Sequence, residues 1–424
     1  MILRSSRVVL PDGVRPAEIR IEDGKIARVD VDAWLPSGTT NLVISPGIVD
    51  THVHVNEPGR TDWEGFQTAT RAAAAGGVTT IVDMPLNSIP ATTTVAALEA
   101  KRAAARGKCR VNVEYWGGVV PGNASELEPL IDAGVRGFKC FLVPSGVDEF
   151  QHVEEKDLRE AMPILSRRNV PLLVHAENPQ SLITPHSAIL NPQYSVYLAT
   201  RPPRAEASAI RMMARLSREF GTHVHIVHVA SAEAADAVAR AKADGVRITA
   251  ETCPHYLTFT ADDIRDDATE FKCAPPIREA RHRAALWTAL HNGTLDLIAT
   301  DHSPSPPAMK TRDFMTAWGG ISSIELSLAA VNSQASTLKS HVESSELRLA
   351  RWMSDGPAKL AKLSSKGRIA EGYDADLVVW DPDETWTVDP AQLQQRHKLT
   401  PYAGRTLRGR VHETYVGGER VFTL

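Results

Sequence analysis

This sequence of 424 residues has few cysteines, no long apolar run and only a small net charge. Its four cysteines are scattered and form no Cys-x-x-Cys pair, which argues against a disulfide framework and a zinc knuckle and predicts a reducing, cytoplasmic location. No apolar run approaches the roughly 20 residues of a membrane-spanning helix. A net charge of -4 gives no electrostatic reason to expect nucleic acid or a membrane as a partner.

Two common catalytic motifs are also missing. No serine stands in a Gly-x-Ser-x-Gly setting, so a serine nucleophile is not expected. The first buried-strand candidate, residues 47–55, is followed by Asn56-Glu57-Pro58-Gly59-Arg60 rather than by a glycine-rich phosphate loop. The missing loop weighs against an open, doubly wound sheet, which is the alternative fold for an alternating chain.

The middle of the chain alternates between short apolar runs and helical patterns. Ser231 is positioned to cap a helix over 232–243, and Ser125-Glu126-Leu127-Glu128 has the form of a capping box. Eight runs have the composition of buried strands: residues 47–55, 79–85, 110–119, 137–143, 170–177, 223–230, 247–253 and 295–301. Strand and helix repeated eight times predict an α/β fold, a (β/α)8 TIM-like barrel over residues 47–365.

The two ends of the chain are β-rich instead. Residues 1–46 contain short strands with a hairpin turn at Asp23-Gly24, and residues 366–424 contain a strand and a second hairpin at Gly417-Gly418. Because both ends have the same character, we predict that they combine into one small composite β-sandwich domain beside the barrel.

Polar residues at the carboxyl ends of five predicted strands form a candidate catalytic centre, because barrel enzymes carry their chemistry at that end. They are His52, His54, Lys139, His175, His228 and Asp301. His52 and His54 are two residues apart on one strand, so both rings point to the same face. Such a pair alone is compatible with hydrogen-bonded core histidines, but four imidazoles and a carboxylate together suit divalent transition metals.

Lys139 is the unusual member, because an ammonium group is costly to bury within an apolar strand. Its amine could be neutral and act as a base or Schiff-base nucleophile, or it could reach solvent at the strand end. Alternatively, the amine could capture carbon dioxide as a carbamate whose two oxygens bridge two cations. In this last interpretation one ion is held by His52, His54 and Asp301, and the other by His175 and His228.

Two such ions would activate a water molecule and polarise a substrate carbonyl. Asp301 is then expected to take the proton of the water and pass it to the leaving nitrogen, which predicts hydrolysis at an acyl or amide carbon. The ligands suit zinc first, with cobalt, nickel, manganese or iron as alternatives. His223 and His225 are expected to be core residues or to support the ligands, and His255 is compatible with either pocket lining or packing.

The order of these motifs resembles that of the amidohydrolase superfamily, and most of all its cyclic amidases: dihydroorotases, hydantoinases and allantoinases. The matching segments are Asp50-Thr51-His52-Val53-His54, Gly137-Phe138-Lys139, Val174-His175-Ala176-Glu177, His225-Ile226-Val227-His228-Val229 and Ala299-Thr300-Asp301-His302-Ser303-Pro304. The resemblance implies two divalent metal ions bridged by a carboxylated lysine, here Lys139, with carbon dioxide as its source. It also implies a homodimer or homotetramer.

Within this branch the flanking residues are similar to those of the allantoinases. Dihydroorotases typically carry an arginine where Asn56 stands, and a neutral amide there fits a substrate without a carboxylate, such as allantoin. The resemblance therefore implies opening of the hydantoin ring of allantoin to give allantoate. Substrate contacts are implied for Asn56, Asn87, Ser303, Ala274, Pro275, Gly319 and Gly320. The alternatives are hydantoinase, dihydropyrimidinase or dihydroorotase activity and, more remotely, a non-catalytic hydantoinase-like oligomer.

Overall fold

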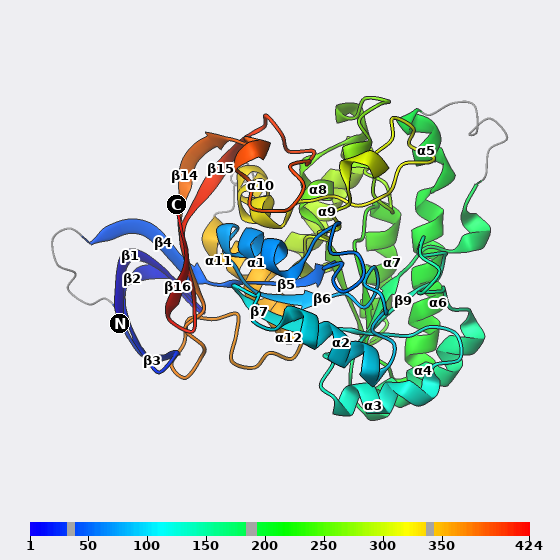
Figure 1. Cartoon of the computed structure of the whole chain (residues 1–424), viewed down its shortest axis with the longest axis horizontal. Coiled ribbons are helices and arrows are strands. Elements are labelled where there is room, and N and C mark those ends of the chain that lie inside the picture. The colour runs from blue at the N-terminus through cyan, green and yellow to red at the C-terminus, as the bar shows by residue number, and fades with distance from the viewer. Residues whose placement is uncertain (32–38, 184–192, 336–342) are drawn as a thin grey trace.

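The computed structural model describes residues 1–31, 39–183, 193–335 and 343–424. Figure 1 shows a sheet-rich unit, built from both ends of the chain, beside a barrel that is surrounded by helices.

The barrel consists of parallel strands at all eight predicted positions. They are β5 (Ile48–Val53), β6 (Val78–Asp83), β7 (Asn112–Tyr115) with β8 (Gly117–Gly118), β9 (Phe138–Phe141), β10 (Leu172–His175), β11 (Val224–Ile226), β12 (Ile248–Thr252) and β13 (Leu297–Ile298). Trp116 separates β7 from β8, which pair with β6 and β9 respectively. The ring closes where Val53 bridges His302 and where Asp50 accepts a hydrogen bond from the backbone of Thr300. The predicted (β/α)8 barrel is therefore confirmed.

The helices lie outside the barrel (Figure 1). They are α1 (Phe66–Ala75), α2 (Val95–Ala105), α3 (Leu127–Asp132), α4 (Glu155–Arg167), α5 (Tyr194–Thr200), α6 (Pro203–Phe220), α7 (Ala232–Ala243), α8 (Pro254–Thr258), α9 (Ala280–His291), α10 (Ser327–Ala335), α11 (Ser345–Ala350) and α12 (Gly356–Leu360). Within the described ranges, none of them has both the length and the apolar character that crossing a membrane requires.

Local sequence signals account for one of the two predicted helix caps. Ser231 caps α7, because its hydroxyl accepts a hydrogen bond from the backbone N–H of Ala234 at 3.2 Å. The expected cap at Ser125 is wrong. Ser125 already lies within a 3-10 turn over Ala124–Glu126 that runs directly into α3, so it does not have the extended backbone of a capping residue.

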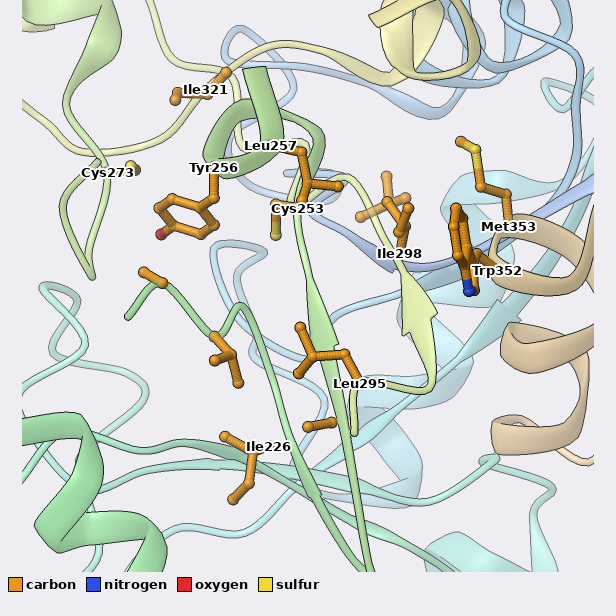
Figure 2. Close-up of a cluster of buried hydrophobic side chains, with 14 of the residues drawn as sticks. Ile226, Cys253, Tyr256, Leu257, Cys273, Leu295, Ile298, Ile321, Trp352 and Met353 are labelled. Carbon is orange, nitrogen blue, oxygen red and sulfur yellow. The ribbon is translucent and has the colours of Figure 1, made fainter. Parts of the chain in front are cut away.

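Alternate residues of the barrel strands face opposite sides. Figure 2 shows part of the outward-facing layer, in which Ile226, Leu295 and Ile298 lie in one apolar cluster with Trp352 and Met353 of the π-helical turn η7 (Arg351–Asp355). The neighbouring residues along the same strands face inward, and they include the polar side chains from which the candidate site is built.

A seven-stranded sheet joins the two ends of the chain in the order β16-β15-β14-β4-β1-β2-β3. Its strands are β1 (Ile2–Leu10), β2 (Gly13–Glu22), β3 (Lys25–Val31), β4 (Thr40–Pro46), β14 (Leu377–Thr387), β15 (Thr406–Val416) and β16 (Glu419–Thr423). The unit encloses its own apolar cluster, to which Ile19, Ile44 and Leu377 belong. It is the composite β-sandwich expected from the two ends, and the exact domain boundaries at 46/47 and 365/366 stay a prediction.

Candidate active site

Three buried side chains, from β5, the residue that follows it and the segment after β13, converge on one point. Nε2 of His52 lies 3.2 Å, and Nε2 of His54 lies 3.4 Å, from Oδ1 of Asp301. The possible ligand atoms of this group all lie within 4.8 Å of one another. Burial lowers the pKa of His54 to about 4, so its imidazole is neutral at pH 7 and offers a lone pair. We call His52, His54 and Asp301 the first ligand group, since it can hold one divalent ion.

The carboxylate of Asp301 remains ionised despite its burial. Burial alone would raise its pKa, but the imidazoles of His52, His54 and His228 hold the pKa well below its ordinary value. Asp50 ties the two segments of the first ligand group together. Its carboxylate accepts hydrogen bonds from Thr300 N at 3.1 Å, Thr300 Oγ1 at 2.5 Å and His52 N at 3.1 Å.

Two further imidazoles face this group from β10 and from the segment after β11. The ring centroids of His175 and His228 are 4.6 Å apart, and the ring of His228 is 5.5 Å from that of His52. Strand β11 ends at Ile226, and His228 has a positive φ of 42°, so the alternation of a regular strand does not extend to it. Burial lowers the pKa of both His175 and His228, so both rings are neutral at pH 7.

Lys139 lies on β9 beside these two imidazoles, and we call His175, His228 and Lys139 the second ligand group. Its side chain is 0% exposed, and its Nζ has no hydrogen-bond partner among the described residues. The Nζ atom lies 4.8 Å from the ring centroid of Phe141, whose ring stacks on His175 at 4.7 Å. Burial lowers the pKa of this amine to about 8, against the opposing effect of Asp301 and Glu251. The lysine therefore does not reach solvent.

Two buried carboxylates that the sequence reasoning did not single out fix the orientation of ligand imidazoles. Oε1 of Glu251 lies 2.5 Å from Nδ1 of His52, and Oε2 of Glu177 lies 2.7 Å from Nε2 of His175. Arg201 forms an ion pair with Glu177. Because a carboxylate holds the N–H of each ring, the other nitrogen of His52 and of His175 is left free for a ligand. An acidic residue inside an apolar strand was the available signal for Glu251.

A cavity of about 430 Å³ opens next to both ligand groups. Of the predicted substrate contacts, Asn87, Ser303, Ala274, Gly319 and Gly320 line it. Much of its remaining wall is apolar, with Leu86, Phe141, Val143, Pro144, Leu182, Ile183 and Trp318. Trp318 makes an edge contact with Trp63 at 5.0 Å between ring centroids, which joins two of the loops around the cavity. The size and lining suit a small molecule with both polar and apolar parts.

Two predicted substrate residues lie behind the wall of this cavity. Asn56 is 0% exposed, its Nδ2 donates to the carbonyl of Pro304 at 3.3 Å, and its Oδ1 has no hydrogen-bond partner among the described residues. Pro275 is buried, and its carbonyl accepts a hydrogen bond from the hydroxyl of Tyr256. His255 is also fully buried and packs against the ring of Tyr256 at 4.2 Å. Of its two possible roles, the structure favours packing.

Comparison with known proteins agrees with this arrangement. Residues 43–421 match the amidohydrolase family. The chain is 50% identical to an allantoinase of Streptomyces avermitilis, over 99% of this chain and 95% of that protein. It is 40% identical to an allantoinase of Arabidopsis thaliana, over 99% of this chain and 87% of that protein.

Solved structures of two cyclic amidases have the same fold. The L-hydantoinase from Arthrobacter aurescens matches with a TM-score of 0.92 and 30% identity, covering 100% of this chain and 97% of its own. A dihydropyrimidinase from Brevibacillus agri matches with a TM-score of 0.89 and 26% identity, covering 100% and 95%. The chain belongs to the amidohydrolase family. It is accordingly an enzyme, a hydrolase of a metal-dependent family.

Proposed function

We propose that this protein hydrolyses the cyclic amide of allantoin and releases allantoate. The observation that carries the proposal is the 50% identity to an allantoinase over 99% of the chain, together with six candidate ligand residues that are all buried, five of which line one cavity. The geometry alone supports hydrolysis of a cyclic amide. The similarity to allantoinases indicates that the ring opened is that of allantoin.

The donor set fits two divalent metal ions. The first ligand group would hold one ion through two neutral imidazoles and a carboxylate, and His175 and His228 would hold the other. The buried amine of Lys139 would add to the carbon of carbon dioxide and lose one proton, which gives a carbamate of charge -1 with two oxygens. Zinc suits these ligands, and cobalt, nickel, manganese or iron are alternatives.

The bound ions would lower the pKa of a water molecule and polarise the carbonyl of the substrate. Asp301 has the only carboxylate that both belongs to a ligand group and lines the cavity, among the residues that the structure describes. It would accept the proton of the attacking water and return it to the ring nitrogen when the C–N bond breaks. Glu251 and Glu177 would keep His52 and His175 in the tautomers that this arrangement requires.

The substrate would lie in the cavity between the ligand groups and the loops that carry Asn87, Ser303 and Gly319-Gly320. Asn56 is fully buried and does not line the cavity. It would therefore act on the substrate indirectly, through the shape of the loop that contains it, or directly after a local rearrangement. The homodimer or homotetramer and the cytoplasmic location stay predictions.

Hydantoinase activity is the alternative that a specific observation favours, because the solved structures quoted above are a hydantoinase and a dihydropyrimidinase. The non-catalytic alternative fits less well, since none of the ligand residues is missing. Initial rates of the purified, metal-loaded protein on allantoin, unsubstituted hydantoin, dihydrouracil and dihydroorotate would test the proposal. We expect the highest kcat/KM with allantoin, and a higher value with any of the other three would overturn the assignment.

A further inference from the structure

A continuous row of polar side chains runs through the interior of the barrel from the first ligand group. Oε1 of Glu251 lies 2.5 Å from Nδ1 of His52, and its Oε2 lies 3.0 Å from Nε2 of His225. Oγ1 of Thr249 lies 2.8 Å from Nδ1 of His225 and 2.8 Å from Nε2 of His223. Five side chains carried by β5, β11 and β12 and the residue before β11 are thus linked without a gap, and we call them the polar row.

The polar row ends at a second cavity. His223 and Thr249 border this space of about 380 Å³, together with Leu295, Asp296 and Leu297 at the start of β13. It therefore lies at the amino ends of the strands, opposite the candidate active site at their carboxyl ends. Glu251 and His225, in the middle of the row, are 0% exposed. The row connects the two ends of the barrel through its core.

Packing alone does not require polar residues at these positions. The parallel register aligns His225 with Leu173 of β10, and Leu173 in turn with Lys139 of β9. Leu173 is 0% exposed and belongs to the inward-facing apolar cluster. An apolar side chain therefore fits this layer. Burying His225 and Glu251 instead carries a desolvation cost, which only their hydrogen bonds can offset.

Counting donors and acceptors fixes the direction of each hydrogen bond in the row, and all of them run toward Glu251. The Glu251 carboxylate can only accept, so His52 and His225 each donate one ring N–H to it. With one ring proton, on Nε2, His225 accepts at Nδ1, which commits the only proton of the Thr249 hydroxyl. The oxygen of Thr249 must in turn accept from Nε2–H of His223. The pattern therefore spreads outward from Glu251: its carboxylate fixes the tautomers of His52 and His225, His225 fixes the direction of the Thr249 hydroxyl, and that hydroxyl fixes the tautomer of His223.

We propose that His223, Thr249 and His225 are positioning residues, which act through Glu251 to hold His52 with its Nδ1 protonated and its Nε2 free for the metal ion. This inference rests on the metal site of the proposed function. Removing the hydroxyl of Thr249 leaves Nδ1 of His225 without a hydrogen-bond donor, so that the ring is held by Glu251 alone and the positions of both His225 and Glu251 are less well fixed. The ligand geometry of His52 would then be less well defined.

Three variants test the row by metal binding rather than by turnover. Thr249→Val removes the hydroxyl at nearly constant volume, Thr249→Ser keeps it, and Thr80→Val is the matched control. Thr80 is a 0% exposed threonine of β6 whose hydroxyl has no hydrogen-bond partner among the described residues. Each metal-free protein is titrated with Co²⁺ in competition with a chelator, and the absorption spectrum of the bound ion is recorded.

Thr249→Val should weaken one of the two bound Co²⁺ ions by about tenfold or more and change its spectrum, as loss of outer support does at other metal sites. Thr249→Ser and Thr80→Val should bind both ions within about twofold of the native protein, because neither breaks the row. Native affinity and spectrum in Thr249→Val would overturn the proposal. So would equal losses in Thr249→Val and Thr249→Ser, which would indicate packing.

His223→Ala keeps the test decisive if Thr249→Val does not fold, because His223 is only half-buried beside the second cavity. It should weaken binding of the same ion by less than Thr249→Val does. An unchanged affinity would contradict the proposed role of the polar row. Turnover of allantoin is not used as a readout, so a wrong substrate assignment leaves this comparison valid. A native protein that binds no metal would contradict both proposals.

Discussion

The two ligand groups differ in charge. The first contains the carboxylate of Asp301 between two imidazoles, whereas the second contains two neutral imidazoles and the amine of Lys139. A divalent cation can bind to the first group as the chain folds it. The second group has no anion of its own, so the proposed second ion would need one added to the lysine. In the proposed two-ion centre, the folded chain would therefore supply one half, and the other half would depend on carboxylation of Lys139.

The groups also differ in what holds them. His52 of the first group is supported by Glu251 and the rest of the polar row inside the barrel. His175 of the second group is supported by Glu177, which is paired with Arg201 at the cavity wall. The supporting contacts of His52 thus run into the interior of the barrel, whereas those of His175 lead to the wall of the cavity.

The largest effect should come from Lys139→Ala, which removes the only source of an anion in the second group. We expect loss of metal and a fall in turnover of about 10⁴-fold or more, because several kcal/mol of charge stabilisation is lost. Metal analysis and kcat/KM measure this. Short carboxylic acids should restore part of the activity by replacing the carbamate.

Cys140→Ala is the matched control for this variant. Cys140 is adjacent in the chain but belongs to the outward-facing apolar cluster, so its loss should leave metal content unchanged. A Lys139→Ala protein with its full metal content would refute the bridging carbamate.

Asp301→Asn tests the first group with a smaller change. It removes the proton acceptor but keeps an oxygen that can face the ion, so kcat should fall by about 10²- to 10⁴-fold with most of the metal retained. Turnover close to the native rate, in protein with native metal content, would exclude Asp301 as the base.

Glu251→Gln and Glu177→Gln separate the two groups. Each should weaken metal binding by about 10- to 100-fold, the usual cost of losing a carboxylate behind a ligand histidine. The two variants should affect different ions in a Co²⁺ titration. Weakening of the same ion in both would mean that the groups are not independent.

The smallest effect concerns pH. Burial lowers the pKa of Lys139 to about 8, so the reactive neutral amine is more abundant as the pH rises. Reactivation of metal-free protein by metal, at one fixed concentration of dissolved carbon dioxide, should therefore be about fivefold faster at pH 8 than at pH 7. Its rate, followed by turnover after timed additions, should not change if the lysine is not carboxylated.

The barrel could be predicted, and its candidate ligands could be singled out, because strands buried on both faces are continuous apolar runs, in which histidine and lysine stand out. Glu251 could not be assigned in this way. Its role depends on a contact with His52, 199 residues away in the sequence, and on hydrogen bonds across β11 and β12. Asn56 illustrates the limit for loops, because its place two residues after His54 in the chain does not determine whether its side chain lines the cavity.

The central claim is that a two-ion centre with a carboxylated lysine performs the hydrolysis. Turnover of allantoin measured alongside metal content, during removal of the metal by a chelator and restoration with zinc and bicarbonate, tests it most directly. The account predicts that activity falls with the metal, and that full activity returns at two ions per chain only when bicarbonate is present. Full activity with no bound metal would contradict it.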